Sequence, residues 1–292
     1  MHDASFTEHR AHGLDASAPS PFAPRPTADG ATALRERYGA WAVVTGASDG
    51  IGREFAIRLA ASGLDVVLVA RRAAVLAELG AFIESTYDVR ATVVAVDLAR
   101  ADGVRELARR TEELDVGLLV AAAGFGTAGR FIDGILEDEL EMIDVNCRAV
   151  AALTHHYGAR FAKQRRGGIV LLSSLVAFQG VPRAANYAAT KAYVQSLAEG
   201  IRSELGPAGV DVVSCAPGPI SSGFGKRARM NMSLSLGPEA VAQAPIEALG
   251  KRGTVRPGWL SKVLEWSLAL LPRWGRVRMM GIVMGGMTKH LA

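Results

Sequence analysis

The chain has 292 residues, of which 49% are hydrophobic and 21% are charged, and its formal net charge at pH 7 is +4. These values are ordinary for a globular protein with a core of normal size, and the chain lacks the run of about five or six like charges that would favour nucleic-acid binding. It also lacks the uncharged apolar run of about 18 residues that a membrane span needs, so we expect a soluble protein and do not expect membrane contact.

The first 32 residues differ in composition from the rest. Four prolines between residues 19 and 26 punctuate a polar stretch, which has too little apolar surface to offset the entropy lost on ordering. We therefore expect residues 1–32 to be a disordered tail. A catalytic domain is expected over residues 33–257, and an apolar helix with a tail, packed on that domain or on a partner subunit, over residues 258–292.

From residue 34 onward, valine-rich apolar runs alternate with longer stretches of helical period. The expected strands are Trp41–Thr45, Asp65–Ala70, Ala91–Val96, Gly117–Ala122, Gly168–Ser173, Asp211–Cys215 and a weaker one near Thr254–Arg256. The expected helices lie at residues 50–62, 72–86, 102–113, 136–163, 187–205 and 238–250. Apolar strands that alternate with helices are typical of a parallel sheet covered on both faces. We predict one α/β domain, a Rossmann-like doubly wound fold with a mostly parallel seven-stranded sheet, whose ligand crevice lies beyond the carboxyl ends of the strands.

The sequence TGASDGIG directly follows the first expected strand and opens the first helix. Glycines at these positions let the backbone turn tightly and approach a dinucleotide pyrophosphate, which the positive end of the helix attracts. A plain turn is the alternative, and the strand before and the helix after argue against it. The expected cofactor contacts in this loop are Gly46, Ser48, Asp49, Gly50, Ile51 and Gly52.

The second and third strands end on residues suited to the adenosine half of such a cofactor. Where an acid would bind the ribose of NAD, the chain has Arg71, whose guanidinium can pair with the 2′-phosphate of NADP. The alternative for Arg71 is a solvated residue in the first turn of a helix. Asp97 and Leu98 follow the third strand and are placed to meet the adenine edge, although Asp97 can equally be a helix cap.

Tyr187 and Lys191 lie four residues apart on an expected helix, so their side chains share one face. We expect the lysine ammonium to lower the pKa of the tyrosine, which suits general acid–base work. Ser174 ends a buried strand and can donate a hydrogen bond to a carbonyl oxygen that gains negative charge. Asn146 interrupts a long helix, where it can hold a water beside Lys191 or serve as a satisfied polar group between helices.

Together, these motifs resemble the short-chain dehydrogenase/reductase family over roughly residues 38–256. The resemblance implies that the tyrosine is the general acid or base and that the lysine also binds the nicotinamide ribose. It further implies that the serine orients the substrate, that the asparagine supports a proton relay, and that a Pro-Gly segment meets the nicotinamide carboxamide. The matching positions of that segment are Pro217, Gly218, Ile220 and Ser222.

One position departs from the family pattern. The fourth strand of such enzymes usually ends in Asn-Asn-Ala-Gly, whereas this chain has three alanines before Gly124. Backbone contacts and Gly124 can still accommodate the cofactor, so we expect a local change rather than inactivity. Residues 38–44 look like those of the 3-oxoacyl-CoA and 17β-hydroxysteroid reductase subgroup, which suggests a lipophilic substrate.

Two later segments are candidates for the substrate side. Residues 224–236 contain Met230, Met232 and Leu234, which suit an apolar pocket under a mobile lid or ordinary core filling. Trp259–Leu271 is apolar on several faces and is too short to cross a bilayer. It is read as a pocket cover or subunit contact, with a helix on a membrane surface as the alternative.

The sequence therefore predicts an NADP(H)-dependent enzyme that moves a hydride to or from a carbonyl carbon. Its partner would be a small carbonyl or alcohol substrate, with no nucleic acid and no metal. The alternative is a catalytically silent NADP-binding sensor or scaffold. The resemblance also implies a homodimer or homotetramer through the two longest helices, and two cysteines without a disulfide or zinc pattern favour a cytoplasmic location.

Overall fold

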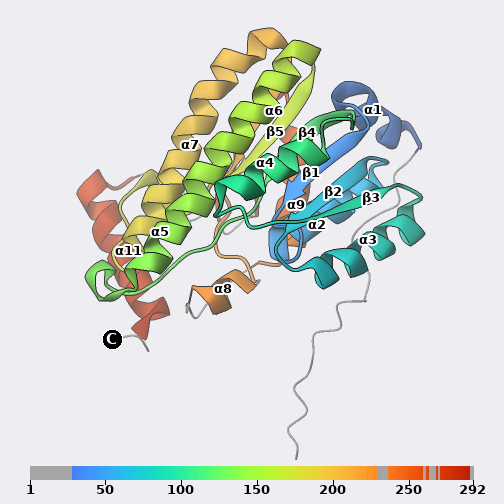
Figure 1. The fold of residues 1–292 in the computed structure, drawn as a ribbon. Helices are drawn as coiled ribbons and strands as arrows, with labels where there is room; N and C mark the ends of the chain where they lie inside the picture. The colour runs from blue at the N-terminus through green and yellow to red at the C-terminus, as the bar shows by residue number, and fades with distance from the viewer. Residues whose placement is uncertain are drawn as a thin grey trace, which may run out of the picture.

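Seven strands form one parallel sheet in the order β3-β2-β1-β4-β5-β6-β7 (Figure 1). The strands are β1 Trp41–Thr45, β2 Asp65–Ala70, β3 Ala91–Ala95, β4 Val116–Ala121, β5 Gly167–Leu172, β6 Val210–Cys215 and β7 Thr254–Val255. This computed structural model describes residues 28–221, 223–228, 230, 236–258, 261–262, 268 and 270–289. The predicted α/β, Rossmann-like fold with seven parallel strands is confirmed.

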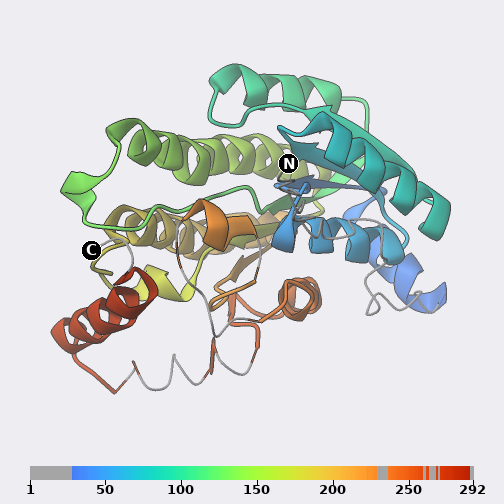
Figure 2. The same ribbon diagram turned by 90° about the horizontal axis from the view of Figure 1, so that it is seen from below.

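Helices cover both faces of the sheet, as the views in Figures 1 and 2 show. They are α1 Ala28–Tyr38, α2 Gly50–Ala61, α3 Ala73–Tyr87, α4 Ala101–Arg110, α5 Leu136–Ile143, α6 Val150–Gln164, α7 Ala185–Leu205, α8 Gly223–Arg227, α9 Glu239–Ala248 and α11 Arg273–Met287. Side chains from α2, α3 and α9 pack with one side of the strands, and those from α4, α6 and α7 pack with the other. Successive residues of a strand therefore enter opposite cores, as in Val43 and Val44 of β1.

In the sheet, β2 and β3 lie on one side of β1, and β4 to β7 lie on its other side. The connections on the two sides of β1 lead away from each other, so a crevice opens beyond the carboxyl ends of these strands. The loops that follow β1, β2, β4 and β5 all border this crevice. The fold thus brings together residues from distant parts of the sequence, such as Gly46 and Tyr187.

Several helices differ from the expectations. The expected helix 136–163 is divided into α5 and α6 by a π-helical turn, Asp144–Ala149. Helix α1 begins at Ala28, inside the range expected to be a tail, and residues 1–27 lie outside the described part of the chain. Helix α11 was not expected, and Trp259–Leu271, where a helix was expected, lies largely outside the described residues.

Helix α11 packs beside the loop that leads into α7 (Figure 1). A Cβ on Gly281 would meet the ring of Pro182 at 3.3 Å, and Met284 is buried with Val181 and Ala184. The guanidinium of Arg183 also donates hydrogen bonds to Thr288, just after α11. Within the described residues, no helix is long and apolar enough to cross a bilayer.

Candidate active site

A cavity of about 890 Å³ lies along the carboxyl ends of the strands. The sequence-predicted residues that line it are Gly46, Ser48, Asp49, Gly50, Ile51, Gly52, Arg71, Asp97, Leu98, Gly124, Ser174, Tyr187, Lys191, Pro217, Gly218 and Ile220. Asn146 lies buried behind the wall, and Ser222 lies outside the described residues. The structure therefore gathers around one cavity the residues predicted for both the cofactor and the chemistry.

In the glycine loop after β1, neighbouring stretches of backbone pack closely against each other. Gly46 and Gly50 adopt φ values of 70° and 51°, which side-chain-bearing residues rarely adopt. A Cβ on Gly52 would lie 2.3 Å from the carbonyl oxygen of Gly46. Arg72 holds this loop from outside, because its guanidinium donates to the Ser48 carbonyl at 2.8 Å. The first turn of α2 thus presents bare backbone to the cavity, which fits the pyrophosphate of a dinucleotide.

Arg71 lines the cavity at the end of β2 and donates to Oε1 of Glu141 at 3.1 Å. Glu141 lies on α5 and receives a second hydrogen bond from Arg227 of α8, at 3.2 Å. The Arg71 side chain is 53% exposed, so its contact with the cofactor stays a prediction, as does the alternative of a solvated residue. Its charge at the ribose end of the crevice fits a 2′-phosphate.

Asp97 and Leu98 also line the cavity. The helix-cap alternative for Asp97 is wrong, because α4 begins at Ala101 and Arg100 is the residue at its N-cap. The Asp97 carboxylate instead accepts a hydrogen bond from the backbone of Ala99 at 3.0 Å. The contact with adenine stays a prediction.

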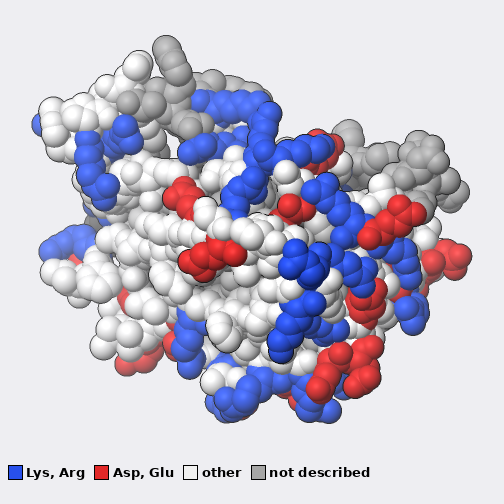
Figure 3. Space-filling model, turned by 90° about the horizontal axis from the view of Figure 1, so that it is seen from above, with Lys and Arg blue, Asp and Glu red and all other residues white. Residues whose placement is uncertain are grey.

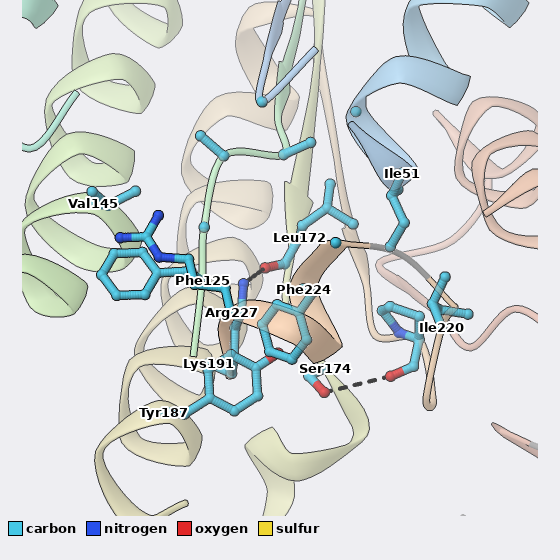
Figure 4. A pocket seen from close by; sticks show the side chains of 18 of the residues that line it. Ile51, Phe125, Val145, Leu172, Ser174, Tyr187, Lys191, Ile220, Phe224 and Arg227 are labelled. Carbon is cyan, nitrogen blue, oxygen red and sulfur yellow. Dashed lines mark hydrogen bonds between the residues drawn. The ribbon is translucent and has the colours of Figure 1, made fainter. Parts of the chain in front are cut away.

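The side chains of Tyr187 and Lys191 lie one turn apart near the start of α7 and face the cavity (Figure 4). Burial raises the pKa of Tyr187 to about 12, and a hydrogen bond with Ser174 opposes this rise. The expected lowering of the tyrosine pKa by Lys191 is therefore wrong for this structure. The Lys191 ammonium lies 5.8 Å from the centre of the tyrosine ring and donates to the Leu172 carbonyl at 2.7 Å. Tyr187 is accordingly a neutral phenol at pH 7, ready to donate a proton.

Ser174 follows β5 and bridges two segments of the site. Its hydroxyl donates to the Pro217 carbonyl at 3.5 Å and accepts from the backbone of Val176 at 3.4 Å (Figure 4). Both distances are long for hydrogen bonds that involve a hydroxyl, so the hydroxyl is weakly held and can turn toward a substrate oxygen. Its hydrogen bond with Tyr187 places the two side chains at one point of the cavity.

Asn146 lies in the π-helical turn, which turns its amide toward the end of β4 and α7. The amide exchanges two hydrogen bonds with the backbone of Phe125, at 3.1 and 2.8 Å, and donates to Thr190 at 3.0 Å. These contacts are those of a satisfied polar group between elements. A Cβ on Gly124 would lie 2.9 Å from the Asn146 oxygen and 3.5 Å from the Lys191 nitrogen, so both groups flank Gly124. The water relay stays a prediction.

Sequence reasoning proposed Met230 for an apolar pocket but missed the part of the cavity wall that α11 forms. Helix α11 contributes Met279, Met280, Val283, Met284 and Met287 to the lining. The spacing of four and three residues from Met280 to Met287 is a helical signal that pointed to one apolar face. Met230 and Phe224 complete this wall, and the Phe224 ring lies 5.2 Å from the Tyr187 ring. Met232 and Leu234 lie outside the described residues. The substrate side of the cavity is thus apolar and rich in methionine.

The buried lysine predicts a pH-dependent stability. Burial lowers the pKa of Lys191 from 10.5 to about 8. Between these values the unfolded chain holds the proton and the folded chain does not, so the free energy of unfolding should rise with pH through this window. The difference in unfolding free energy between wild type and Lys191→Met should grow in the same window, as urea denaturation at a series of pH values would measure.

A matched control is Lys163→Met, because Lys163 is exposed on α6. The difference in unfolding free energy between wild type and Lys163→Met should stay constant with pH. Parallel pH profiles for wild type and Lys191→Met would contradict a depressed lysine pKa.

Comparison with known proteins agrees with this geometry. The sequence profile of the family described as short chain dehydrogenase matches residues 40–233. A 7beta-hydroxysteroid dehydrogenase of Mediterraneibacter gnavus is 32% identical over 242 residues, which cover 80% of this chain and 92% of that protein. A very-long-chain 3-oxoacyl-CoA reductase of Phaeosphaeria nodorum is 30% identical and is matched over 79% of this chain and 71% of its own length.

Solved structures show the same likeness. One from a study of 7beta-hydroxysteroid dehydrogenase stereoselectivity superposes with a TM-score of 0.78 at 31% identity, covering 85% of this chain and 98% of that one. A short-chain dehydrogenase from Sphingobium yanoikuyae in complex with NADPH has a TM-score of 0.70 at 26% identity, covering 80% and 96%.

The fold and the site define a dinucleotide-binding α/β domain in which a tyrosine, a lysine and a serine meet beside a glycine-rich loop. The chain belongs to the short-chain dehydrogenase family and is an oxidoreductase.

Proposed function

We propose that this chain is an NADP(H)-dependent oxidoreductase that interconverts a ketone and a secondary alcohol on a lipophilic substrate. The observation that carries the proposal is the single cavity, which has a glycine loop and Arg71 at one end and Ser174, Tyr187 and Lys191 beside an apolar wall at the other. The nicotinamide of the cofactor would supply or accept the hydride. Related structures named as complexes with NADPH or NADP support this choice of cofactor.

Tyr187 is proposed to donate the proton to the substrate oxygen in the reducing direction. Its raised pKa keeps the phenol protonated at neutral pH, and Ser174 adds a second donor to the same oxygen as negative charge develops there. The Lys191 ammonium is proposed to hold the nicotinamide ribose. Asn146 positions the backbone of Phe125 through its amide.

The apolar wall supports a lipophilic substrate. Transfer of a molecule's apolar surface from water to such a wall stabilises its binding by about 25 cal/mol per Å² of surface buried. The names of the relatives point the same way, since one acts on a hydroxysteroid and another on very long 3-oxoacyl chains. A steroid-like ketone and a long 3-oxoacyl thioester are therefore the two substrate classes to test.

The test is NADPH oxidation by the whole chain against ketosteroids, 3-oxoacyl thioesters and small polar ketones. We expect kcat/KM for the best lipophilic ketone to exceed that for the small polar ketones by at least about tenfold, or about 1.4 kcal/mol. Turnover of the polar ketones alone would contradict the substrate class. A protein that binds NADPH and turns over none of them would favour the silent sensor.

Arg71 carries the proposed cofactor preference. Arg71→Asp replaces a guanidinium by a carboxylate that repels a 2′-phosphate and accepts hydrogen bonds from a 2′-hydroxyl. The wild type should bind NADPH at least about tenfold more tightly than NADH, and this variant should prefer NADH. Fluorescence titration with both cofactors measures the two dissociation constants, and equal constants in the wild type would contradict the preference.

A homodimer or homotetramer through the long helices is also proposed. The exposed apolar side chains Leu136, Leu140 and Ile143 on α5 and Tyr193 on α7 support it. On the face seen in Figure 3, basic and acidic side chains are interspersed over much of the surface, which suits a small-molecule enzyme better than a nucleic-acid-binding protein. A cytoplasmic location is proposed because Cys147 and Cys215 are free thiols.

A further inference from the structure

Two guanidiniums from distant segments meet at one carboxylate oxygen beside the cavity. Arg71 at the end of β2 and Arg227 on α8 both donate to Oε1 of Glu141, at 3.1 and 3.2 Å. All three residues line the cavity. A single oxygen held between two forked cations has the local arrangement of an anion-binding site that is occupied by a side chain of the protein.

Arg227 is held at this place by a second contact. Its guanidinium lies 3.4 Å above the ring of Phe125, in the segment after β4 (Figure 4). Stacking on an aromatic face orients the plane of a guanidinium and leaves its edge free to donate hydrogen bonds. Arg227 therefore donates to the same oxygen as Arg71, although α8 follows the Pro-Gly segment and lies far from β2 in the sequence.

We propose that Arg227 and Arg71 together form the site for the 2′-phosphate of the cofactor, and that Glu141 occupies this site until the phosphate displaces it. The inference rests on the proposed use of NADP(H). A phosphate carries more charge than a carboxylate and offers three oxygens, so it satisfies both guanidiniums better than one Glu141 oxygen does. The Glu141 carboxylate is then a competitor that weakens binding of the phosphate.

The proposal also gives α8 a role in selecting the cofactor. Arg227 brings α8 to the Glu141 oxygen that Arg71 also binds, while Phe224 of the same helix packs on Tyr187. Binding of a 2′-phosphate would therefore fix the segment that covers the catalytic tyrosine. A cofactor without that phosphate would leave Arg227 on Glu141.

The experiment measures binding of adenosine fragments to the whole chain by calorimetry, without any turnover. The probes are adenosine 2′,5′-bisphosphate, which carries the 2′-phosphate, and adenosine 5′-monophosphate, which lacks it. Arg227→Met should weaken binding of the bisphosphate by about tenfold, a loss comparable with one charge-assisted hydrogen bond, and should leave the monophosphate unchanged. Glu141→Gln should strengthen binding of the bisphosphate severalfold and leave the monophosphate unchanged.

Two further variants make the result specific. Arg227→Lys keeps the positive charge but loses the planar guanidinium that can donate two parallel hydrogen bonds. Its affinity for the bisphosphate should therefore lie between those of wild type and Arg227→Met. Arg109→Met removes an exposed arginine that pairs with Glu106 on α4 away from the cavity, and it should bind both probes as the wild type does. Because Arg227 is exposed, its substitution should leave the melting temperature close to that of wild type.

The outcomes separate this inference from the proposed function. Unchanged bisphosphate affinity in Arg227→Met, with a loss in Arg71→Met, would overturn the two-arginine site and leave the NADP(H) assignment intact. Weaker bisphosphate binding in Glu141→Gln would show that Glu141 positions the arginines and would overturn its role as a competitor. A wild type that binds the two probes equally would instead overturn the NADP(H) preference itself.

Discussion

Tyr187→Phe is expected to lower turnover by at least about a hundredfold, the usual lower scale of general acid–base assistance. The substitution keeps the ring that packs on Phe224 and removes only the hydroxyl, which is proposed to donate the proton. The dissociation constant for NADPH should change little. Steady-state kinetics on an accepted ketone, together with NADPH titration, measure both quantities.

Two neighbouring substitutions complete the pattern. Ser174→Ala should lower turnover with little effect on cofactor binding, because its hydroxyl is proposed to donate to the substrate oxygen. Lys191→Met should harm both turnover and NADPH affinity, because the ammonium is proposed to hold the ribose. Full activity in Tyr187→Phe would refute this mechanism even if the cofactor site proved correct, and a silent binding protein would have no turnover to lose.

Gly52→Ala is the second substitution with a large expected effect. The added Cβ would stand 2.3 Å from the Gly46 carbonyl oxygen and 3.0 Å from that of Thr45, so the loop has to move away from α2. Overpacking of this kind costs about 1–3 kcal/mol of unfolding free energy. The displaced loop no longer fits a pyrophosphate, and we expect the NADPH dissociation constant to rise by at least about tenfold.

Gly80→Ala is the matched control for this change. A Cβ on Gly80 of α3 would meet its neighbours at 3.6 Å or more, which is ordinary contact. Alanine also favours a helix over glycine by about 1 kcal/mol, so this variant should be as stable as wild type or more stable, with unchanged cofactor affinity. Thermal melting and NADPH titration of the two variants side by side check the expectation, and wild-type affinity in Gly52→Ala would contradict it.

The parts of the fold that depend on local pattern were predictable from sequence. Valine-rich runs have a different period from helices, so the predicted bounds of each of the seven strands lie within two residues of the observed bounds. The parallel direction of the strands follows from their alternation with helices. The predicted residues of the glycine loop and the Tyr187–Lys191 pair also line one cavity. Their positions were predictable because the loop directly follows a strand and the pair lies on one helix.

What depends on distant contacts was not predictable. The π-helical turn at Asn146 is stabilised by contacts with Phe125 and Thr190, and no local propensity announces them. The predicted direction of the Tyr187 pKa shift was wrong, because the sequence shows the neighbouring lysine but does not show that the tyrosine is buried. The meeting of Arg71, Glu141 and Arg227 joins three segments whose proximity only the folded chain reveals.

The methionine wall also makes the cavity sensitive to oxidants. Of the eight methionines of the chain, Met230, Met279, Met280, Met284 and Met287 line the cavity. Oxidation of a thioether to the sulfoxide adds a polar oxygen and removes an apolar contact. Met279 is 44% exposed, whereas Met284 is buried, so peroxide would reach the rim of the wall before its interior. Oxidative damage would therefore impair the binding of an apolar substrate before it reached the glycine loop, which contains no sulfur.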